Sequence, residues 1–147
     1  MKSLWQEHTR SEVLTRVNSV TDDSHRLWGT MSAPRMLRHL VRAMAMAVEE
    51  LPTTPKKMPF RYFPLKQLVI YVLPIPNDVP TVPELRVKED TPIEDSRREL
   101  RRLMLKFADR GGITTWPDHP AFGKLSKSGW GVLTYRHINH HLRQFGA

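Results

Sequence analysis

Apolar residues recur along the chain in four stretches, at the three- and four-residue spacing that places side chains on one face of a helix. These stretches predict four helices, at about residues 11–20, 32–51, 93–109 and 129–145. We find no internal repeat, and no convincing strand lies between them. The pattern therefore predicts an all-α fold, a four-helix bundle formed by a single domain over residues 1–147.

Residues with strong end preferences mark the limits of the predicted helices. Ser11 is expected to cap the first helix, because a serine hydroxyl accepts backbone N–H groups at a helix start. The second helix is expected to start at Ser32, which an early proline follows, and to stop before Pro52. The third is expected to begin after Pro92 and to end at Gly111.

A proline-rich insert separates the second and third predicted helices. Eight of the twelve prolines lie between Pro52 and Pro83, which excludes one long helix or a central strand here. Residues 65–73 could form a short buried helix or a strand, and we favour the helix because no partner strand is visible. Residues 74–90 are expected to form an extended loop that wraps the outside of the bundle.

The last predicted helix carries two histidines at the centre of its apolar face, His137 and His141. On a helical wheel both lie within about 20° of Trp130, whereas Arg136 and Arg143 lie on the opposite side. Burying two imidazoles is costly unless their nitrogens find partners. The i, i+4 spacing brings both rings within reach of one ion, so we predict that they bind a divalent metal.

A third metal ligand is expected from the second helix. His39 lies at the edge of the apolar arc formed by Met36, Leu40, Ala43, Met44, Ala47 and Val48. Three histidines leave one coordination position open, as in catalytic rather than closed structural zinc sites. Gln144 lies one turn beyond His141, and His140 lies toward the edge of the same face. These two side chains are expected to pack against the ligands or to hydrogen-bond to them.

The other histidines have a simpler explanation. A single histidine on a helix is more often a packed residue than a ligand, and this alternative holds for His39 taken alone. His8 and His25 have no metal-binding context and are expected at the surface. His119 lies in a tight loop between Asp118 and a proline, where a structural role is favoured over one that covers the site.

Composition restricts the chemistry. The chain has no cysteine, which excludes disulfides, thiolate metal sites and a cysteine nucleophile. The longest apolar run, residues 68–73, is far shorter than the ~20 residues needed to span a bilayer. No signal-peptide core is present at the N-terminus. We therefore expect a cytoplasmic protein without a membrane partner.

The net charge of +8 would suit a nucleic-acid partner. The basic residues are spread along the chain, however, and the basic run at residues 97–102 lies in a helix that also carries acidic residues at ion-pair spacing. A solvated surface with ion pairs is the favoured explanation. A nucleic-acid partner is not expected, although this alternative stays open.

The histidine motifs resemble the metal-binding elements of the DinB/YfiT-like superfamily. The resemblance rests on Met36-Leu37-Arg38-His39-Leu40 and His137-x-x-His140-His141-x-x-Gln144. Three further motifs resemble a bacterial branch of unknown function: Trp28-Gly29-x-Met31-Ser32, His119-Pro120-Ala121-Phe122-Gly123-Lys124-Leu125 and Gln144-Phe145-Gly146. The resemblance covers about residues 10–147. It implies an up-down-down-up four-helix bundle, usually a homodimer, in which His39, His137 and His141 bind zinc, nickel or a similar ion.

Superfamily members of known chemistry include thiol-dependent transferases and isomerases that use bacillithiol, mycothiol or glutathione. The resemblance thus implies a metal-dependent enzyme of transferase or hydrolase type, with a small-molecule substrate and a low-molecular-weight thiol as cosubstrate. The chain departs from the commonest ending of those members, His-His-Arg-Gly-Gln, at Leu142 and Arg143. No general base stands out, and Glu50 is a weak candidate. A non-catalytic, metal-stabilised module that binds a small molecule or a protein is the alternative.

Overall fold

The computed structural model describes residues 1–77 and 82–147. It contains the helices α1 (Glu7–Ser19), α2 (Ala33–Ala47), α3 (Leu65–Gln67), α4 (Ile93–Asp109) and α5 (Lys127–Gln144), and the short turns η1 (Pro59–Arg61), η2 (Leu68–Val72), η3 (Pro83–Leu85) and η4 (Arg110–Gly112). No strand occurs within these described ranges, which confirms the predicted all-α fold. Within the same ranges, no helix has both the length and the apolar composition needed to cross a membrane.

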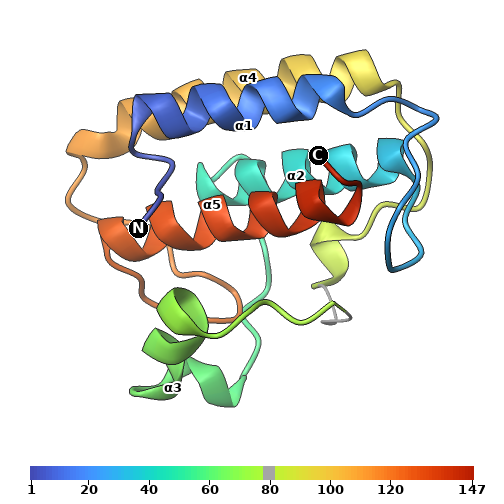
Figure 1. The fold of residues 1–147 in the computed structure, drawn as a ribbon. Helices are drawn as coiled ribbons and strands as arrows, with labels where there is room; N and C mark the ends of the chain where they lie inside the picture. The colour runs from blue at the N-terminus through green and yellow to red at the C-terminus, as the bar shows by residue number, and fades with distance from the viewer. Residues whose placement is uncertain (78–81) are drawn as a thin grey trace.

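The four long helices α1, α2, α4 and α5 lie side by side and form the bundle (Figure 1). Helices α1 and α5 run in one direction and α2 and α4 in the other, which is the expected up-down-down-up order (Figure 1). Their apolar faces form one core. Its largest fully buried side chains are Trp130, Phe107, Leu4, Met36, Leu37, Leu40, Met44, Leu100, Leu103, Met104, Ile138 and Leu142.

Helix α4 has the predicted boundaries, and one face of it is buried. The buried residues of α4 are Ile93, Ser96, Leu100, Leu103, Met104 and Phe107. Its other face carries ion pairs, such as Arg98 with Asp95 at 2.9 Å and Arg102 with Glu99 at 2.7 Å. The interpretation of residues 97–102 as an ion-paired helix face is therefore confirmed.

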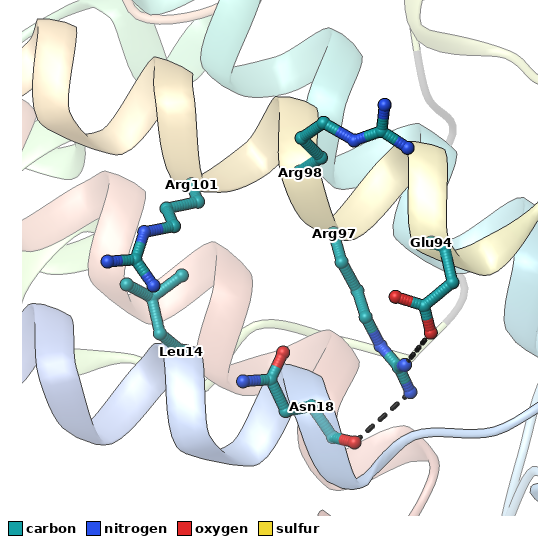
Figure 2. A pocket seen from close by; sticks show the side chains of 6 residues that line it. All are labelled: Leu14, Asn18, Glu94, Arg97, Arg98 and Arg101. Atoms are coloured by element: carbon teal, nitrogen blue, oxygen red, sulfur yellow. Dashed lines mark hydrogen bonds and ion pairs between the residues drawn. The ribbon is translucent and has the colours of Figure 1, made fainter.

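A pocket of about 400 Å³ lies between α1 and α4 (Figure 2). It is lined by Leu14, Asn18, Glu94, Arg97, Arg98 and Arg101. Arg97 pairs with Glu94 and donates to the carbonyl oxygen of Asn18 at 3.1 Å (Figure 2). The Arg97 guanidinium therefore already has anionic and carbonyl partners and is part of the ion-paired helix face.

Helix α1 begins earlier than predicted. It starts at Glu7 with Gln6 as its N-cap residue, so Ser11 lies inside the helix and the prediction of a Ser11 cap is wrong. The preceding residue Leu4 is fully buried, and its N–H donates to the carbonyl oxygen of Gly131 at 3.1 Å. Contacts with α5 therefore fix the chain before the helix, and the start of α1 needs no serine cap.

The serine cap of α2 is confirmed, because the Ser32 side chain accepts the N–H of Arg35 at 3.4 Å. The helix ends at Ala47 rather than near Leu51. Glu49 has a φ of +62°, in the left-handed region, and this turn stops the helix before Pro52 is reached.

The insert contains the predicted short helix, formed by α3 and the π-helical turn η2. Its predicted burial is wrong, because Ile70 is the one buried residue of these two elements. We call residues 52–77 the insert lobe. The lobe contacts α5 through Ile70, which packs in a second, smaller core with Phe122, Val132 and Leu133.

The chain between the lobe and α4 does not simply wrap the outside of the bundle as expected. Val82 and Leu85 are 8% and 7% exposed and belong to the main core, and η3 packs on α2. Residues 78–81 of the predicted extended loop lie outside the described residues. This inward course brings the backbone of η3 to His39.

Candidate metal centre

Three histidines from two helices meet inside the bundle. His39 comes from α2, and His137 and His141 come from α5; each offers one ring nitrogen, and these nitrogens lie within 4.8 Å of one another. His39 Nε2 is 3.1 Å from His137 Nε2. Zinc–nitrogen bonds of about 2.0–2.1 Å place two tetrahedral ligands roughly 3.3 Å apart. The structure thus brings the three predicted ligands together, and the His39–His137 pair has a separation that suits one ion.

The helices explain why the three rings meet. His137 and His141 are one turn apart on α5, and their ring centroids are 4.8 Å apart. His39 lies on the buried face of α2 and is 3% exposed. Its ring centroid is 5.0 Å from that of His137 and 4.8 Å from that of His141. Each ring is therefore in contact with the other two.

Hydrogen bonds fix which nitrogen of His39 faces the other rings. Its Nδ1 is 2.9 Å from the carbonyl oxygen of Leu85. A carbonyl oxygen only accepts, so Nδ1 carries the hydrogen and Nε2 keeps its lone pair. That lone pair faces His137 Nε2 at 3.1 Å. A backbone carbonyl behind a histidine is the usual support for a metal ligand.

Gln144 supports His141 in the same way. Its Nε2 donates to the carbonyl oxygen of Trp28 at 2.8 Å, which fixes the orientation of the amide. Its Oε1 lies 3.0 Å from His141 Nδ1 and must accept, so that Nδ1 carries the hydrogen. His141 Nε2 is thereby left free to bind an ion. Gln144 lies where the sequence predicted a supporting residue.

Burial keeps the three rings uncharged. It lowers the pKa of His137 well below the usual value, and the neighbouring His141 and His39 add to this shift. Burial, and then the proximity of His39, lowers the pKa of His141 to about 3. Burial also lowers the pKa of His39. Metal ions bind the neutral form of imidazole, so the site is in its binding form at neutral pH.

His140 lies beside the three histidines but outside their group. Its ring centroid is 5.2 Å from that of His141 and 5.7 Å from that of Trp28, so it packs between these two rings. Burial, and then the charge of Arg143, lowers its pKa. Its predicted role in supporting the ligands stays a prediction.

The remaining histidines have the positions expected from the sequence. His119 accepts the N–H groups of Ala121 and Phe122 at its Nδ1, at 3.1 and 3.3 Å, and so holds its own loop in shape. His8 and His25 are exposed. The favoured structural role of His119 is thereby supported.

Glu50 does not act on the site. It pairs with Lys106 at 2.6 Å and with Arg102, both on the polar face of α4. These hydrogen bonds, that of Arg102 first, lower the pKa of the Glu50 carboxyl to about 2. A carboxylate held in this way is a poor base, so the weak candidacy of Glu50 as general base is not supported.

Two supports of the site were not predicted, the carbonyl oxygens of Leu85 and Trp28. Backbone acceptors leave no signature in the residue that provides them. For the Trp28 carbonyl, the following residue Gly29 is a signal in the sequence. Its φ is +76°, and a Cβ there would lie 2.5 Å from Gln144 Nε2. A glycine is therefore needed where the chain passes Gln144.

Removing the Gln144 amide is expected to weaken metal binding. In Gln144→Leu, His141 Nδ1 loses its acceptor and the ring its fixed orientation, so affinity for zinc should fall by roughly 10–100-fold. Competition with a chromophoric chelator measures this directly. Arg143→Gln, a change at the exposed neighbouring position, is the matched control and should bind as wild type does. Equal affinities in both variants would contradict a supporting role for Gln144.

The stability of the metal-free protein is expected to fall with falling pH. The folded-state pKa of His141 is about 3, whereas an unfolded histidine titrates near 6.5, so the unfolded chain binds more protons between these values. Stability is therefore lost as pH drops from about 6.5 toward 3, by roughly 1 kcal/mol per pH unit from this one group. Urea unfolding across this range measures the slope. His141→Gln, which lacks the titrating ring, should have a smaller slope, and an unchanged slope would refute the assignment.

Comparison with known proteins gives a family assignment. Neither a curated protein nor a solved structure matches the chain. One family matches residues 3–147, a range that includes the four long helices and all three histidines of the site. This chain therefore belongs to the family described as "Protein of unknown function (DUF1569)".

Proposed function

We propose that this protein binds one divalent metal ion through His39, His137 and His141 and uses it to act on a small molecule. The orientation of His39 is the observation that carries the proposal. Its Nδ1–H donates to the carbonyl oxygen of Leu85, so its Nε2 lone pair faces His137 Nε2 at 3.1 Å. Without an ion, the His137 Nε2–H must fill that position, and a divalent cation would replace this hydrogen and satisfy all three rings.

The donor set suits zinc or nickel, because imidazole is a preferred ligand of both. With three protein ligands, the bound ion would keep a position for water or substrate, where it would polarise an oxygen, activate water or hold a thiolate. His39 and His141 are held in place by Leu85 and Gln144, so the protein provides a prepared site.

We further propose that this family belongs to the DinB/YfiT-like superfamily and that its chemistry is thiol-dependent, of transferase or hydrolase type. The up-down-down-up order of the bundle supports this (Figure 1), as does the distribution of the ligands over the second and last long helices. We also propose a homodimer in the cytoplasm, where low-molecular-weight thiols stay reduced.

A pocket beside the histidines supports a small-molecule substrate. It has a volume of about 440 Å³ and is lined by Trp28, Pro74, Ile75, Asn77, Arg136, Asn139, His140 and Arg143. Trp28 Nε1 is buried and has no hydrogen-bond partner among the described residues, so a ligand acceptor could satisfy it. Arg143 favours an anionic group on that ligand, whereas Arg136 is already hydrogen-bonded to backbone carbonyls.

A non-catalytic binding module is the alternative, and one observation favours it. The group of side chains that could hold the ion consists of three histidines and contains no carboxylate, and Glu50 is tied to Arg102. A metal-dependent hydrolase commonly uses a carboxylate base beside the metal. Metal binding does not require turnover of a substrate, so metal binding and catalysis need separate tests.

The test uses cobalt as a spectroscopic substitute for zinc. One equivalent of Co²⁺ should give the intense visible absorption of a tetrahedral site, and added glutathione should produce a thiolate-to-cobalt charge-transfer band. Transfer of the thiol to an electrophile such as a chloronitrobenzene, dependent on the metal, would support the enzyme. Metal binding without a thiol band or turnover would favour the binding module. No metal binding at all would refute both.

A further inference from the structure

The insert lobe presents an apolar outer surface. Of the ten large apolar side chains that are exposed among the described residues, six lie within residues 62–73. These six are Tyr62, Phe63, Leu65, Leu68, Val72 and Leu73. Phe63 is 82% exposed and Tyr62 is 70% exposed. Single exposed apolar side chains are normal, but a cluster of this kind marks a surface that binds something.

One side of the lobe is bound to the bundle, so the apolar side chains on its other side face outward. On the inner side, Ile70 is buried against α5. Arg136 of α5 donates to the carbonyl oxygens of Val69, at 3.0 Å, and of Ile70 and Leu73. Lys66 donates to the carbonyl oxygen of Lys124 at 2.9 Å. The exposed side chains therefore belong to a packed element that cannot turn them inward.

The lobe is also basic. Residues 52–77 contain four basic side chains, Lys56, Lys57, Arg61 and Lys66, and no aspartate or glutamate. A second copy of this chain would bring the same charges to the same face, and this repulsion opposes self-association through the lobe. A partner that is complementary in charge to the lobe has an anionic surface. To accept the exposed apolar side chains as well, it must have an apolar layer beneath that surface. A membrane that contains anionic lipids has both properties.

We propose that the insert lobe binds the surface of membranes that contain anionic lipids. Phe63, Tyr62 and the neighbouring aliphatic side chains would lie among the headgroups and upper acyl chains, with Lys56 and Lys57 on the lipid phosphates. The lobe projects from the bundle on the side away from α1 and α4 (Figure 1), so it can meet a flat surface first.

This proposal departs from the expectation of no membrane partner. That expectation rested on the absence of a segment long enough to span a bilayer, and surface binding needs no such segment. Lipid binding is also separate from the metal site, because its residues lie in the insert lobe and the three histidines lie on α2 and α5. Metal-free and metal-loaded protein should therefore bind lipid alike.

Vesicle co-sedimentation of the full chain tests the proposal. Vesicles of phosphatidylcholine and phosphatidylglycerol in equal parts should bind the protein at low salt, and vesicles of phosphatidylcholine alone should bind it at least about tenfold more weakly. Phe63→Ser removes the most exposed aromatic side chain, and Lys57→Glu reverses an exposed charge. Each should weaken binding by roughly tenfold, the second in a salt-dependent manner.

Matched controls come from the exposed face of α4. Leu105→Ser and Arg101→Glu change the same kinds of side chain away from the lobe, and both should bind vesicles as wild type does. A loss in Arg101→Glu but not in Lys57→Glu would overturn the proposal and assign lipid binding to α4. No vesicle binding would also overturn it. If sedimentation then showed self-association that Phe63→Ser abolishes, the lobe would be a contact between copies.

Discussion

The variant His39→Ala is expected to contain no bound metal when wild type contains about one equivalent per chain. In the proposed site His39 is the one ligand from α2, and without it the ion would be left with two nitrogens on one helix. Two ligands one turn apart do not enclose an ion, so the loss of affinity should exceed the roughly 10–100-fold expected for a supporting residue. His137→Ala should behave in the same way.

Elemental mass spectrometry of protein purified without chelator measures the metal content, and His25→Ala is the control, because His25 is exposed. Thermal unfolding gives a second, independent measurement. Zinc at 100 times its dissociation constant should stabilise wild type by about 2.7 kcal/mol, or roughly 5–10 °C. Neither His39→Ala nor His137→Ala should respond. A full equivalent of metal in His39→Ala, with the fold intact by circular dichroism, would remove His39 from the ligand set.

The variant Gly131→Ala is expected to be less stable than wild type by about 1–3 kcal/mol. A glycine-to-alanine change inside a helix normally stabilises by up to about 1 kcal/mol, so the sign itself is diagnostic. A Cβ at Gly131 would lie closer than 3.0 Å to Ser3 Oγ and to the Trp5 ring. The Trp5 ring stacks on the Phe107 ring with centroids 4.3 Å apart, and its Nε1–H donates to the carbonyl oxygen of Lys127 at 2.8 Å. The ring therefore has little freedom to move away.

The matched control is Gly129→Ala in the same helix. There the added Cβ would be no closer than 3.4 Å to its nearest neighbour, Ser126 Oγ, which is ordinary contact. This variant should be as stable as wild type or slightly more stable. Urea unfolding of both variants gives the comparison. Equal stabilities would mean that the N-terminal residues do not pack on Gly131 in solution.

How far the sequence predicts the fold depends on where the determining contacts lie. The approximate bounds predicted for helix α4 agree with the structure, since Pro92, the apolar period and the glycines after Asp109 all lie within the segment or next to it. The start of α1 was missed because it is set from outside the segment. Leu4 is anchored on Gly131, a residue far away in the sequence, and no local pattern carries that information.

The short helix of the insert was predicted correctly, but its predicted burial was wrong. Residues 68–73 form an unbroken apolar run, so their periodicity cannot indicate which side chains are buried. Only the position of the lobe against α5 decides that Ile70 is covered while Val72 is 67% exposed. Burial in a uniformly apolar segment is a property of the tertiary structure.

For the candidate site, periodicity was sufficient to place His137 and His141 together. The contribution of His39 depended on its position beside an apolar arc and on the family resemblance. The carbonyl oxygen of Leu85 was out of reach, because this segment was expected to lie outside the bundle. Side chains with a helical period are visible in the sequence, whereas a backbone atom brought in by an irregular segment is not.

The distance along the chain between the ligands determines when the site can form. His39 and His137 are 98 positions apart. At about 5–20 residues per second, the ribosome adds His137 roughly 5–20 s after His39, and α5 must still dock. During that interval the growing chain offers a single histidine from α2, which cannot compete for scarce metal. If the proposed site binds metal, the ion therefore enters after synthesis, and a chain interrupted before α5 would not retain it.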